Sequence, residues 1–232
     1  STLRQAQVGD APLSPVWTSR SLSRAFRTLD VPLADAKAAA KRNNVSVNDL
    51  FVAGATLAAG DYHRQVGRPA TELRMAMPIS QRADRNIGGN VFSPSQSLLP
   101  ADVTDPADLL ATIHEILART KAEPAMSAAN ALAGVINLLP TSIVARTGYR
   151  FAGVIDFVTS NLRAAPMDTF ISGALMESNY PMGPLAGAAF NLTTMSFRGQ
   201  LNMGLVVDTV AVEEPDRLLT CLKAAYRRLL KA

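Results

Sequence analysis

Segments typical of strands alternate with segments typical of helices along this chain, and that mixed order restricts the fold. Residues 73–79 and 192–197 favour strands, whereas residues 106–121 are predicted as a helix. Strands and helices in mixed order bury their apolar faces by packing in layers, with helices against a sheet. With 232 residues, 48% of them hydrophobic, one large domain can enclose a substantial core. We therefore predict a layered α/β fold.

A hairpin is predicted near the carboxyl end. Residues 192–197 and 201–207 favour strands, and the connection Arg198-Gly199-Gln200 places a glycine where a positive φ is inexpensive. Further strands are predicted at residues 21–29, 91–99, 155–159 and 170–176, and further helices at residues 33–43, 46–67 and 215 onward.

Residues 1–20 have the composition of a linker. They contain Pro12, Pro15 and several serines and threonines. The chain starts at Ser1 without an initiator methionine, which suggests a fragment, a processed product or a trimmed chain. We expect residues 1–20 to lead from a preceding lobe into one domain at residues 21–232.

The charge and the cysteine content exclude several classes of protein. The net charge is +4, and the basic residues are scattered rather than interleaved with aromatic ones, which argues against nucleic-acid binding. The single cysteine, Cys221, cannot form an intrachain disulfide or a cysteine-based zinc site, and it is typical of a reducing cytoplasm. Because no phosphate-binding loop and no metalloprotease motif occurs, we predict no metal and no permanently bound cofactor.

The two histidines do not form a recognisable catalytic arrangement. His63 and His114 are far apart in the sequence, on different predicted helices, and only Glu115 is a neighbouring carboxylate at metal-ligand spacing. We assign neither histidine a catalytic role.

One uncharged stretch, residues 125–145, raises the question of a membrane contact. It contains Asn130, Asn137 and Pro140, and its larger apolar residues recur mostly at helical spacing, as in an amphipathic helix rather than a membrane span. Packing between helices is one interpretation of this stretch. Contact with a membrane or a lipid droplet is the other.

Two polar pairs lie in apolar surroundings. Asn48-Asp49 precedes the apolar run of the helix at residues 46–67, where these side chains either cap the helix or fasten a neighbouring segment at an active-site tunnel. Ser160-Asn161 follows a predicted strand, where the hydroxyl and the amide either end the sheet or donate to a developing oxyanion. The residues alone leave both alternatives open.

A series of short motifs follows in a fixed order along the chain. The series is Val47-Asn48-Asp49, Pro78-Ile79-Ser80, Asn86-Ile87-Gly88-Gly89-Asn90, Thr159-Ser160-Asn161, Pro181-Met182-Gly183-Pro184-Leu185 with Asn191-Leu192-Thr193, and Ser196-Phe197-Arg198-Gly199 with Gly204, Leu205 and Asp208. In order and spacing it resembles the C-terminal half of bacterial wax ester synthase/diacylglycerol acyltransferases. The resemblance runs from about Ser21 to the end, and the closing hairpin is its most specific part.

The resemblance implies one lobe of the chloramphenicol-acetyltransferase-like fold of coenzyme A-dependent acyltransferases, with a mixed sheet flanked by helices. In that superfamily two lobes form a tunnel, and a histidine of an H-H-x-x-x-D-G motif on the N-terminal lobe deprotonates the acceptor hydroxyl. This chain has no such motif. The resemblance therefore implies a general base on an N-terminal lobe, no catalytic residue in this chain, and acyl-coenzyme A as co-substrate.

The same resemblance suggests which residues support the site. The family's Asn-Asp and Ser-Asn motifs match Asn48, Asp49, Ser160 and Asn161. The apolar run at residues 180–190 either lines a path for a long acyl chain or packs as a loop under the sheet. Its tunnel candidates are Pro181, Gly183, Pro184, Leu185 and Asn191.

The leading hypothesis is an O-acyltransferase that moves a fatty acyl group from acyl-coenzyme A to diacylglycerol, forming triacylglycerol, or to a long-chain alcohol, forming a wax ester. This chain alone is expected to be inactive. The whole protein is expected in the cytoplasm, with peripheral contact to the inner face of the membrane or to lipid droplets.

Two alternatives keep the fold and change the function. The first is a non-catalytic lobe that binds lipid or a partner protein. It is favoured by residues 162–166, which read Leu-Arg-Ala-Ala-Pro where the family has Val-Pro-Gly-Pro. The second is another acyl-transfer or condensation enzyme of the same superfamily with a different substrate. Such enzymes commonly carry a D-F-G-W-G-type motif in this half, and the motif is absent from this sequence.

Overall fold

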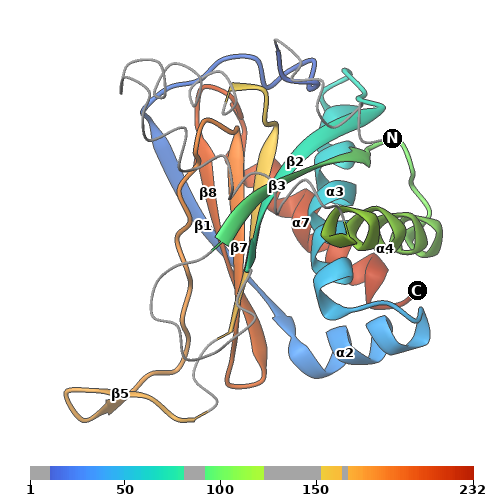
Figure 1. Ribbon diagram of the computed structural model, residues 1–232. Helices are drawn as coiled ribbons and strands as arrows, with labels where there is room; N and C mark the ends of the chain where they lie inside the picture. Colours follow the sequence, from blue (N-terminus) through green and yellow to red (C-terminus); the bar gives the residue numbers. More distant parts are fainter. Residues whose placement is uncertain (1–10, 81–91, 123–152, 164–166) are drawn as a thin grey trace, which may run out of the picture.

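The strand-forming runs of the sequence assemble into a six-stranded mixed sheet (Figure 1). The structure is a computed structural model, and it describes residues 11–80, 92–122, 153–163 and 167–232. The strands of the sheet are β1 (Arg24–Pro32), β2 (Glu72–Ser80), β3 (Phe92–Pro100), β4 (Phe157–Arg163), β7 (Phe190–Phe197) and β8 (Gln200–Asp208). Their order is β1-β8-β7-β4-β2-β3. Strand β4 pairs in parallel with β2 and β7, and the other pairs are antiparallel.

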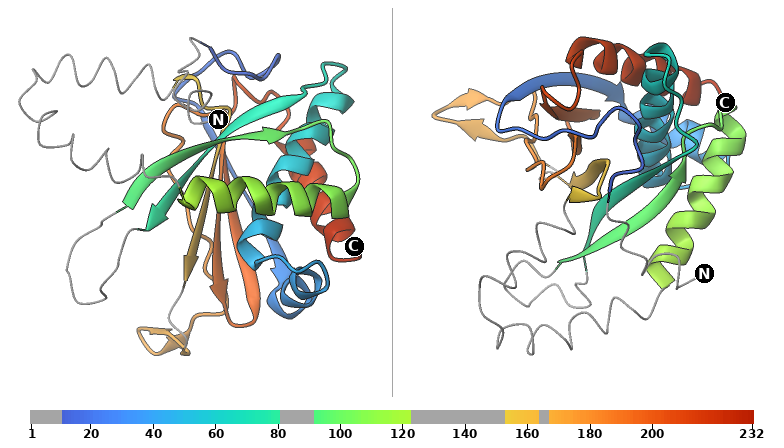
Figure 2. Two further views of the ribbon diagram at one scale, coloured as in Figure 1. Left: turned by 45° about the vertical axis from the view of Figure 1, so that its right-hand side comes forward. Right: turned by 90° about the horizontal axis from the view of Figure 1, so that it is seen from above.

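Helices cover one face of this sheet (Figure 2). They are α2 (Leu33–Arg42), α3 (Val47–Gln65), α4 (Pro106–Ala122) and α7 (Pro215–Leu229). Helix α3 is central, because every residue from Leu50 to Gly60 is buried. Tyr226 of α7 packs so closely on α3 that only glycine fits at position 54, and its hydroxyl donates to the carbonyl oxygen of Phe51 at 2.8 Å. None of the helices described is both long enough and apolar enough to cross a membrane.

Most of the predicted elements are confirmed within a few residues. The closing hairpin is formed by β7 and β8, and both turn residues, Arg198 and Gly199, have positive φ. Residues 170–176 are not the single strand that was predicted. They form a small separate hairpin of β5 (Phe170–Ile171) and β6 (Ala174–Leu175), because Ser172 and Gly173 adopt positive φ and reverse the chain. The uncharged stretch at residues 125–145 and the motif Asn86-Ile87-Gly88-Gly89-Asn90 lie outside the described residues.

The segment before β1 is attached to the domain by buried contacts. Ser14 and Trp17 are both buried. The Ser14 hydroxyl lies 2.7 Å from Nε2 of His63, and the Ser14 backbone N–H donates to Asp156 at 2.9 Å. Burial raises the pKa of Asp156, against the effect of the N–H groups that donate to it. Residues 11–20 therefore pack against this domain, and their role as a linker from a further lobe stays a prediction.

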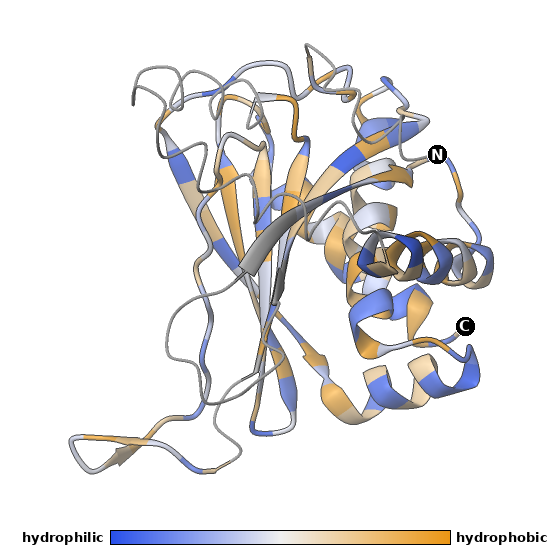
Figure 3. Cartoon of the chain, viewed as in Figure 1, coloured by the Kyte–Doolittle hydropathy of each residue, from blue (hydrophilic) through white to orange (hydrophobic). Residues whose placement is uncertain are grey.

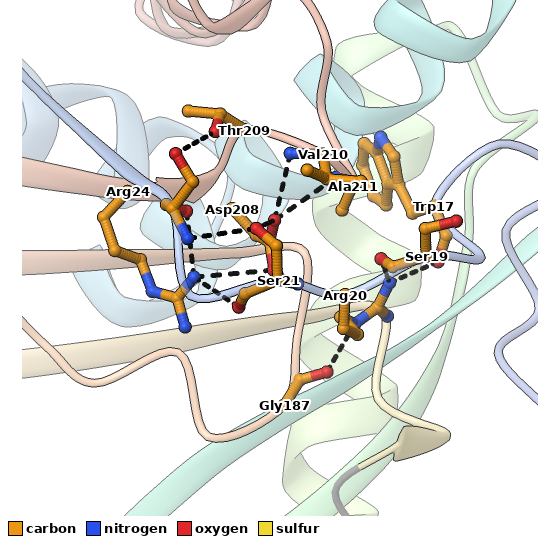
Figure 4. A network of polar contacts seen from close by, with 11 residues as sticks. Trp17, Ser19, Arg20, Ser21, Arg24, Gly187, Asp208, Thr209, Val210 and Ala211 are labelled. Atoms are coloured by element: carbon orange, nitrogen blue, oxygen red, sulfur yellow. Dashed lines mark hydrogen bonds and ion pairs between the residues drawn. The ribbon is translucent and has the colours of Figure 1, made fainter.

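A buried carboxylate ties the start of β1 to the end of β8 (Figure 4). Asp208 accepts from Ser21 N at 2.6 Å, Ser21 Oγ at 2.7 Å and Val210 N at 3.0 Å, and Arg24 lies 3.5 Å away. Burial by itself would raise the pKa of Asp208, but these donors outweigh it and hold the pKa below its usual value. The network fixes the chain where it enters the edge strand.

The face of the sheet away from the helices is crossed by residues 176–188. Gly204 of β8 lets this segment approach, since a side chain there would overlap the carbonyl oxygen of Pro181. The Asn179 N–H donates to the Asn202 side chain at 3.2 Å, and the Tyr180 hydroxyl donates to Asp30 at 2.7 Å. These contacts hold the crossing segment, residues 176–188, directly on the strands.

Replacing Gly204 by alanine should displace the crossing segment. We expect the free energy of unfolding to fall by about 1–3 kcal/mol, because the new methyl group would overlap the backbone oxygen of Pro181, which cannot move aside as the end of a flexible side chain can. Urea unfolding measures this change. Gly153→Ala is the matched control, since a Cβ there meets no atom of the described residues within 4 Å. Equal losses for the two variants would contradict the account.

The Asp208 network should weaken in acid. Because the pKa of Asp208 is lowered by folding, its stabilisation is complete above the unfolded pKa, about 3.9, and is lost as pH falls through the folded pKa. Asp208→Asn should cost about 1.5–3 kcal/mol at neutral pH, and the difference from the unaltered protein should shrink below about pH 4. Urea unfolding between pH 3 and 7 tests this, with the exposed Glu72→Gln as control. A difference that stays constant over this range would refute the assignment.

Candidate functional site

The parallel strands direct their carboxyl ends to one edge of the sheet, next to the start of α3. Ligands of open α/β sheets bind outside the carboxyl ends of parallel strands. Asn161 lies near the carboxyl end of β4, and its register partner in β7 is Thr194. The Asn161 Nδ2 donates to Oδ1 of Asn48, in the first turn of α3, at 3.2 Å. The structure thus brings together one residue from each of the two predicted motifs.

An open groove of about 740 Å³ lies beside this asparagine pair. It extends from α2 and the start of α3 to the ends of β4 and β7. Its lining residues are Leu33, Lys37, Ser46, Val47, Asn48, Asn161, Met167, Asp168, Ser196, Phe197, Arg198, Gly199 and Leu201. We refer to these residues as the asparagine groove.

The asparagine pair leaves polar atoms for a ligand. Asn48 uses its Oδ1 for the bond from Asn161, and its Nδ2 meets only the sulfur of Met77, at 3.9 Å, among the contacts within the described residues. A thioether is a weak acceptor. Among the described residues, an amide N–H of Asn48 and the amide oxygen of Asn161 have no further hydrogen-bond partner, so both can bond a polar group in the groove.

Asp49 faces away from the groove and holds the start of α3. Its backbone N–H donates to Ser46 Oγ at 3.1 Å, and its carboxylate accepts from the Ser46 N–H at 2.9 Å, which is a capping box. The same carboxylate lies 2.8 Å from Nδ1 of His114 on α4. Capping, the simpler of the two interpretations of the sequence, thus describes Asp49, with Ser46 as the N-cap residue. Asp49 also fastens α4, and the second interpretation, a role at an active-site tunnel, stays a prediction.

Ser160 points to the other face of the sheet from Asn161. Successive side chains of a strand alternate between faces, and Asn161 contacts α3 on the helix side. Ser160 pairs with Thr193, whose hydroxyl donates to Asn191 at 2.7 Å. The two members of the Ser-Asn motif therefore do not act on the same surface within this chain.

The tunnel candidates lie on the face opposite the helices and are packed on the strands. Asn191 is buried, and its Nδ2 donates to the carbonyl oxygen of Pro184 at 2.7 Å. A Cβ at Gly183 would lie 2.5 Å from Thr193 Oγ1. Leu185 is buried as well. These contacts describe a loop packed on the sheet, and a role of Pro181, Gly183, Pro184, Leu185 and Asn191 in a tunnel stays a prediction.

Several residues of the groove were not predicted from the sequence. Lys37 projects from α2, and Arg198, in the turn of the closing hairpin, forms an ion pair with Asp168 at 2.5 Å. Arg198 belongs to the motif Ser196-Phe197-Arg198-Gly199, which identified the hairpin but carried no signal for a site. His114 lies 65 residues from Asp49 in sequence, and no local pattern links the two.

Comparisons with known proteins place this fold in a family. Residues 88–230 match the family described as the WS/DGAT C-terminal domain. The chain belongs to this family. WS/DGAT proteins are the wax ester synthase/diacylglycerol acyltransferases. The resemblance of this chain to them, which was based on short motifs, is thus confirmed.

Relatives of the WS/DGAT chain occur in Mycobacterium tuberculosis strain ATCC 25618 / H37Rv. One, provisionally named diacylglycerol O-acyltransferase Rv2484c, is 31% identical over 218 residues, which cover 94% of this chain and 44% of the relative. A second with the same provisional name, Rv3087, is 30% identical over 233 residues, which cover 96% of this chain and 49% of the relative. The chain spans about half the length of these relatives.

Solved structures share the fold of the WS/DGAT chain. The wax ester synthase/diacylglycerol acyltransferase from Marinobacter aquaeolei VT8 has a TM-score of 0.71 at 22% identity, covering 98% of this chain and 54% of that protein. A condensation domain of the enacyloxin polyketide synthase has a TM-score of 0.61 at 14% identity, covering 99% of this chain and 46% of that one. The predicted fold, one lobe of the chloramphenicol-acetyltransferase-like type, is confirmed.

Removing the Asp49 carboxylate should loosen the start of α3. Asp49→Ala leaves the Ser46 N–H and the His114 ring without their acceptor, so we expect a loss of about 1–3 kcal/mol in the free energy of unfolding. His114→Ala should cost less, because Ser46 keeps its acceptor. Urea unfolding of both variants measures these losses.

Glu115→Ala is the matched control for His114→Ala, since Glu115 is the next residue of α4 and forms an exposed pair with Arg119. It should change stability by less than about 0.5 kcal/mol. The clamp between α3 and α4 is refuted if His114→Ala proves as mild as Glu115→Ala.

Proposed function

We propose that this chain is the C-terminal half of an acyltransferase that moves a fatty acyl group from acyl-coenzyme A to diacylglycerol or to a long-chain alcohol. The observation that carries the proposal is the pairing of Asn48 with Asn161 in an open groove of a WS/DGAT chain. The provisional names of the relatives, diacylglycerol O-acyltransferases, support the same reaction class.

The state of the two histidines supports a general base on another part of the protein. His63 is fully buried, and its Nε2 and Nδ1 lie 2.7 Å from Ser14 Oγ and from the carbonyl oxygen of Ala59. Burial lowers the pKa of His63, so the ring is held neutral. His114 is bonded to Asp49. Neither histidine lines the asparagine groove, so a histidine of an H-H-x-x-x-D-G motif on an N-terminal half is the proposed base.

The proposed reaction needs no covalent enzyme intermediate. The base takes the proton of the acceptor hydroxyl, the oxygen attacks the thioester carbonyl, and the tetrahedral intermediate releases coenzyme A as the thiol once the proton is returned to sulfur. In this scheme the Asn48 and Asn161 amides orient the polar part of a substrate in the groove. Asp49 and His114 are positioning residues, because they fix the turn that presents Asn48.

Several parts of the proposal concern the whole protein. Acyl-coenzyme A is the proposed co-substrate, and an N-terminal half is the proposed partner. A cytoplasmic location with peripheral contact to a membrane or lipid droplet would suit acceptors dissolved in lipid. The alternative, a non-catalytic lobe that binds lipid or a partner, predicts that no form of the protein transfers an acyl group.

The first test is acyl transfer with labelled acyl-coenzyme A, with diacylglycerol and hexadecanol as acceptors. We expect no transfer by this chain alone and transfer by the parent protein that includes the preceding half. Transfer by this chain alone would overturn the assignment of the base. No transfer by either form would favour the non-catalytic alternative.

A variant of the asparagine pair tests the groove in the active, longer protein. Asn161→Ala should lower kcat by about 10- to 100-fold through lost positioning, and leave the melting temperature nearly unchanged because Asn161 is exposed. Asn43→Ala is the matched control: Asn43 lies at the end of α2 and bonds the carbonyl oxygen of Ala39 outside the groove. Equal kcat values for the two variants would show that the groove has no part in the mechanism.

A further inference from the structure

The small hairpin of β5 and β6 projects from the body and contains hydrophobic residues (Figure 3). Phe170 is 60% exposed, Ile171 is 61% exposed and Leu175 is 40% exposed, and Met167 just before the hairpin is 68% exposed. We call residues 167–176 the apolar arm. Large apolar side chains gathered on one exposed segment mark an interaction site rather than ordinary surface.

The base of the apolar arm is attached firmly to the domain. Asp168 pairs with Arg198 at 2.5 Å. Within the arm, the Met176 N–H donates to the carbonyl oxygen of Thr169 at 2.9 Å and so closes its base. Farther along the chain, Asn179 and Tyr180 bond to β8 and β1. The arm is therefore held in a defined direction, which lowers the entropy lost when a partner binds it.

The tip of the arm has little that stabilises it within this chain. Two residue pairs, Phe170 with Leu175 and Ile171 with Ala174, make up the ladder, and all four side chains are exposed. A two-stranded hairpin alone is marginally stable in water. Burial of Phe170 and Ile171 against another surface would supply the missing apolar contact.

We propose that the apolar arm docks on the half of the acyltransferase that lies outside this chain. The inference rests on the proposed function, and two observations select this occupant. Met167 and Asp168 at the base of the arm also line the asparagine groove, so the surface that completes the site must lie next to the arm. The relatives are about twice as long as the matched segment, and in the proposed whole protein a further half of similar size would complete the open groove.

The test measures association between this full chain and the preceding half of its parent protein, produced as a separate polypeptide. Isothermal titration calorimetry gives the Kd. A double variant, Phe170→Ser with Ile171→Ser, should weaken binding by about tenfold or more, since exposed aromatic and aliphatic anchors dominate interfaces. Leu175→Ser gives a second, milder variant of the arm, and thermal unfolding checks that each variant is folded.

Leu22→Ser is the matched control, because Leu22 is also apolar and is 92% exposed. It precedes β1 near Asp208, at one end of β8. The arm is tied to Arg198, next to the other end of β8. The control should bind like the unaltered chain. Unchanged binding of both arm variants overturns the proposal. The proposal is also overturned if the double variant keeps its affinity for the other half but loses self-association or loses binding to phosphatidylglycerol vesicles.

Acyl transfer measured on the same mixtures separates this inference from the proposed function. Association that depends on the arm, without acyl transfer, would support the arm and reject the enzyme. Acyl transfer together with a Kd that is unchanged in the Phe170 and Ile171 double variant would support the enzyme and contradict the proposed docking of the arm.

Discussion

The burial of α3 is the constraint on which the rest of the structure depends. Because every residue of the helix from Leu50 to Gly60 is buried and all but Thr56 are apolar, the helix is stable only where it is covered on all sides. The sheet covers one side, while α7 and α4 cover others, and the close contact of Tyr226 with Gly54 sets how near α7 can come. A helix held in this way has one position, and its first turn consequently lies against the carboxyl end of β4.

The position of that first turn separates two neighbouring side chains that look equivalent in the sequence. Asp49 turns inward, where it completes the capping box with Ser46 and meets His114. Asn48 turns toward the groove and meets Asn161. Adjacent residues of a helix point about 100° apart, so one of them can fix the backbone while the other faces a ligand. The proposed site thus consists of Asn48 and Asn161, and Asp49 and His114 support it from behind.

The two faces of the sheet serve different purposes. The helix face encloses the core, and the crossing segment lies over part of the opposite face through contacts such as Asn179 with Asn202. Beyond the crossing segment, the apolar arm extends past the sheet edge at which the asparagine groove opens (Figure 1). An open groove beside an exposed apolar hairpin is the surface expected of half of a two-lobed site, and the matched length of the relatives is consistent with it.

The sequence by itself determined the local elements and the family. The alternation of apolar and polar residues, the helical spacing of apolar residues and the Arg198-Gly199 turn all reflect interactions between residues close in sequence. The strands, the helices and the closing hairpin could therefore be predicted from them. The hairpin at residues 170–176 was missed because two positive φ values at Ser172 and Gly173 decide it, and Ser172 gives no sign of one. Only the tertiary structure decided which polar residues act together. Asn48 meets Asn161 across 113 residues and Asp49 meets His114 across 65, because such pairs are set by how α3 packs between the sheet and α4, and no local periodicity records that packing.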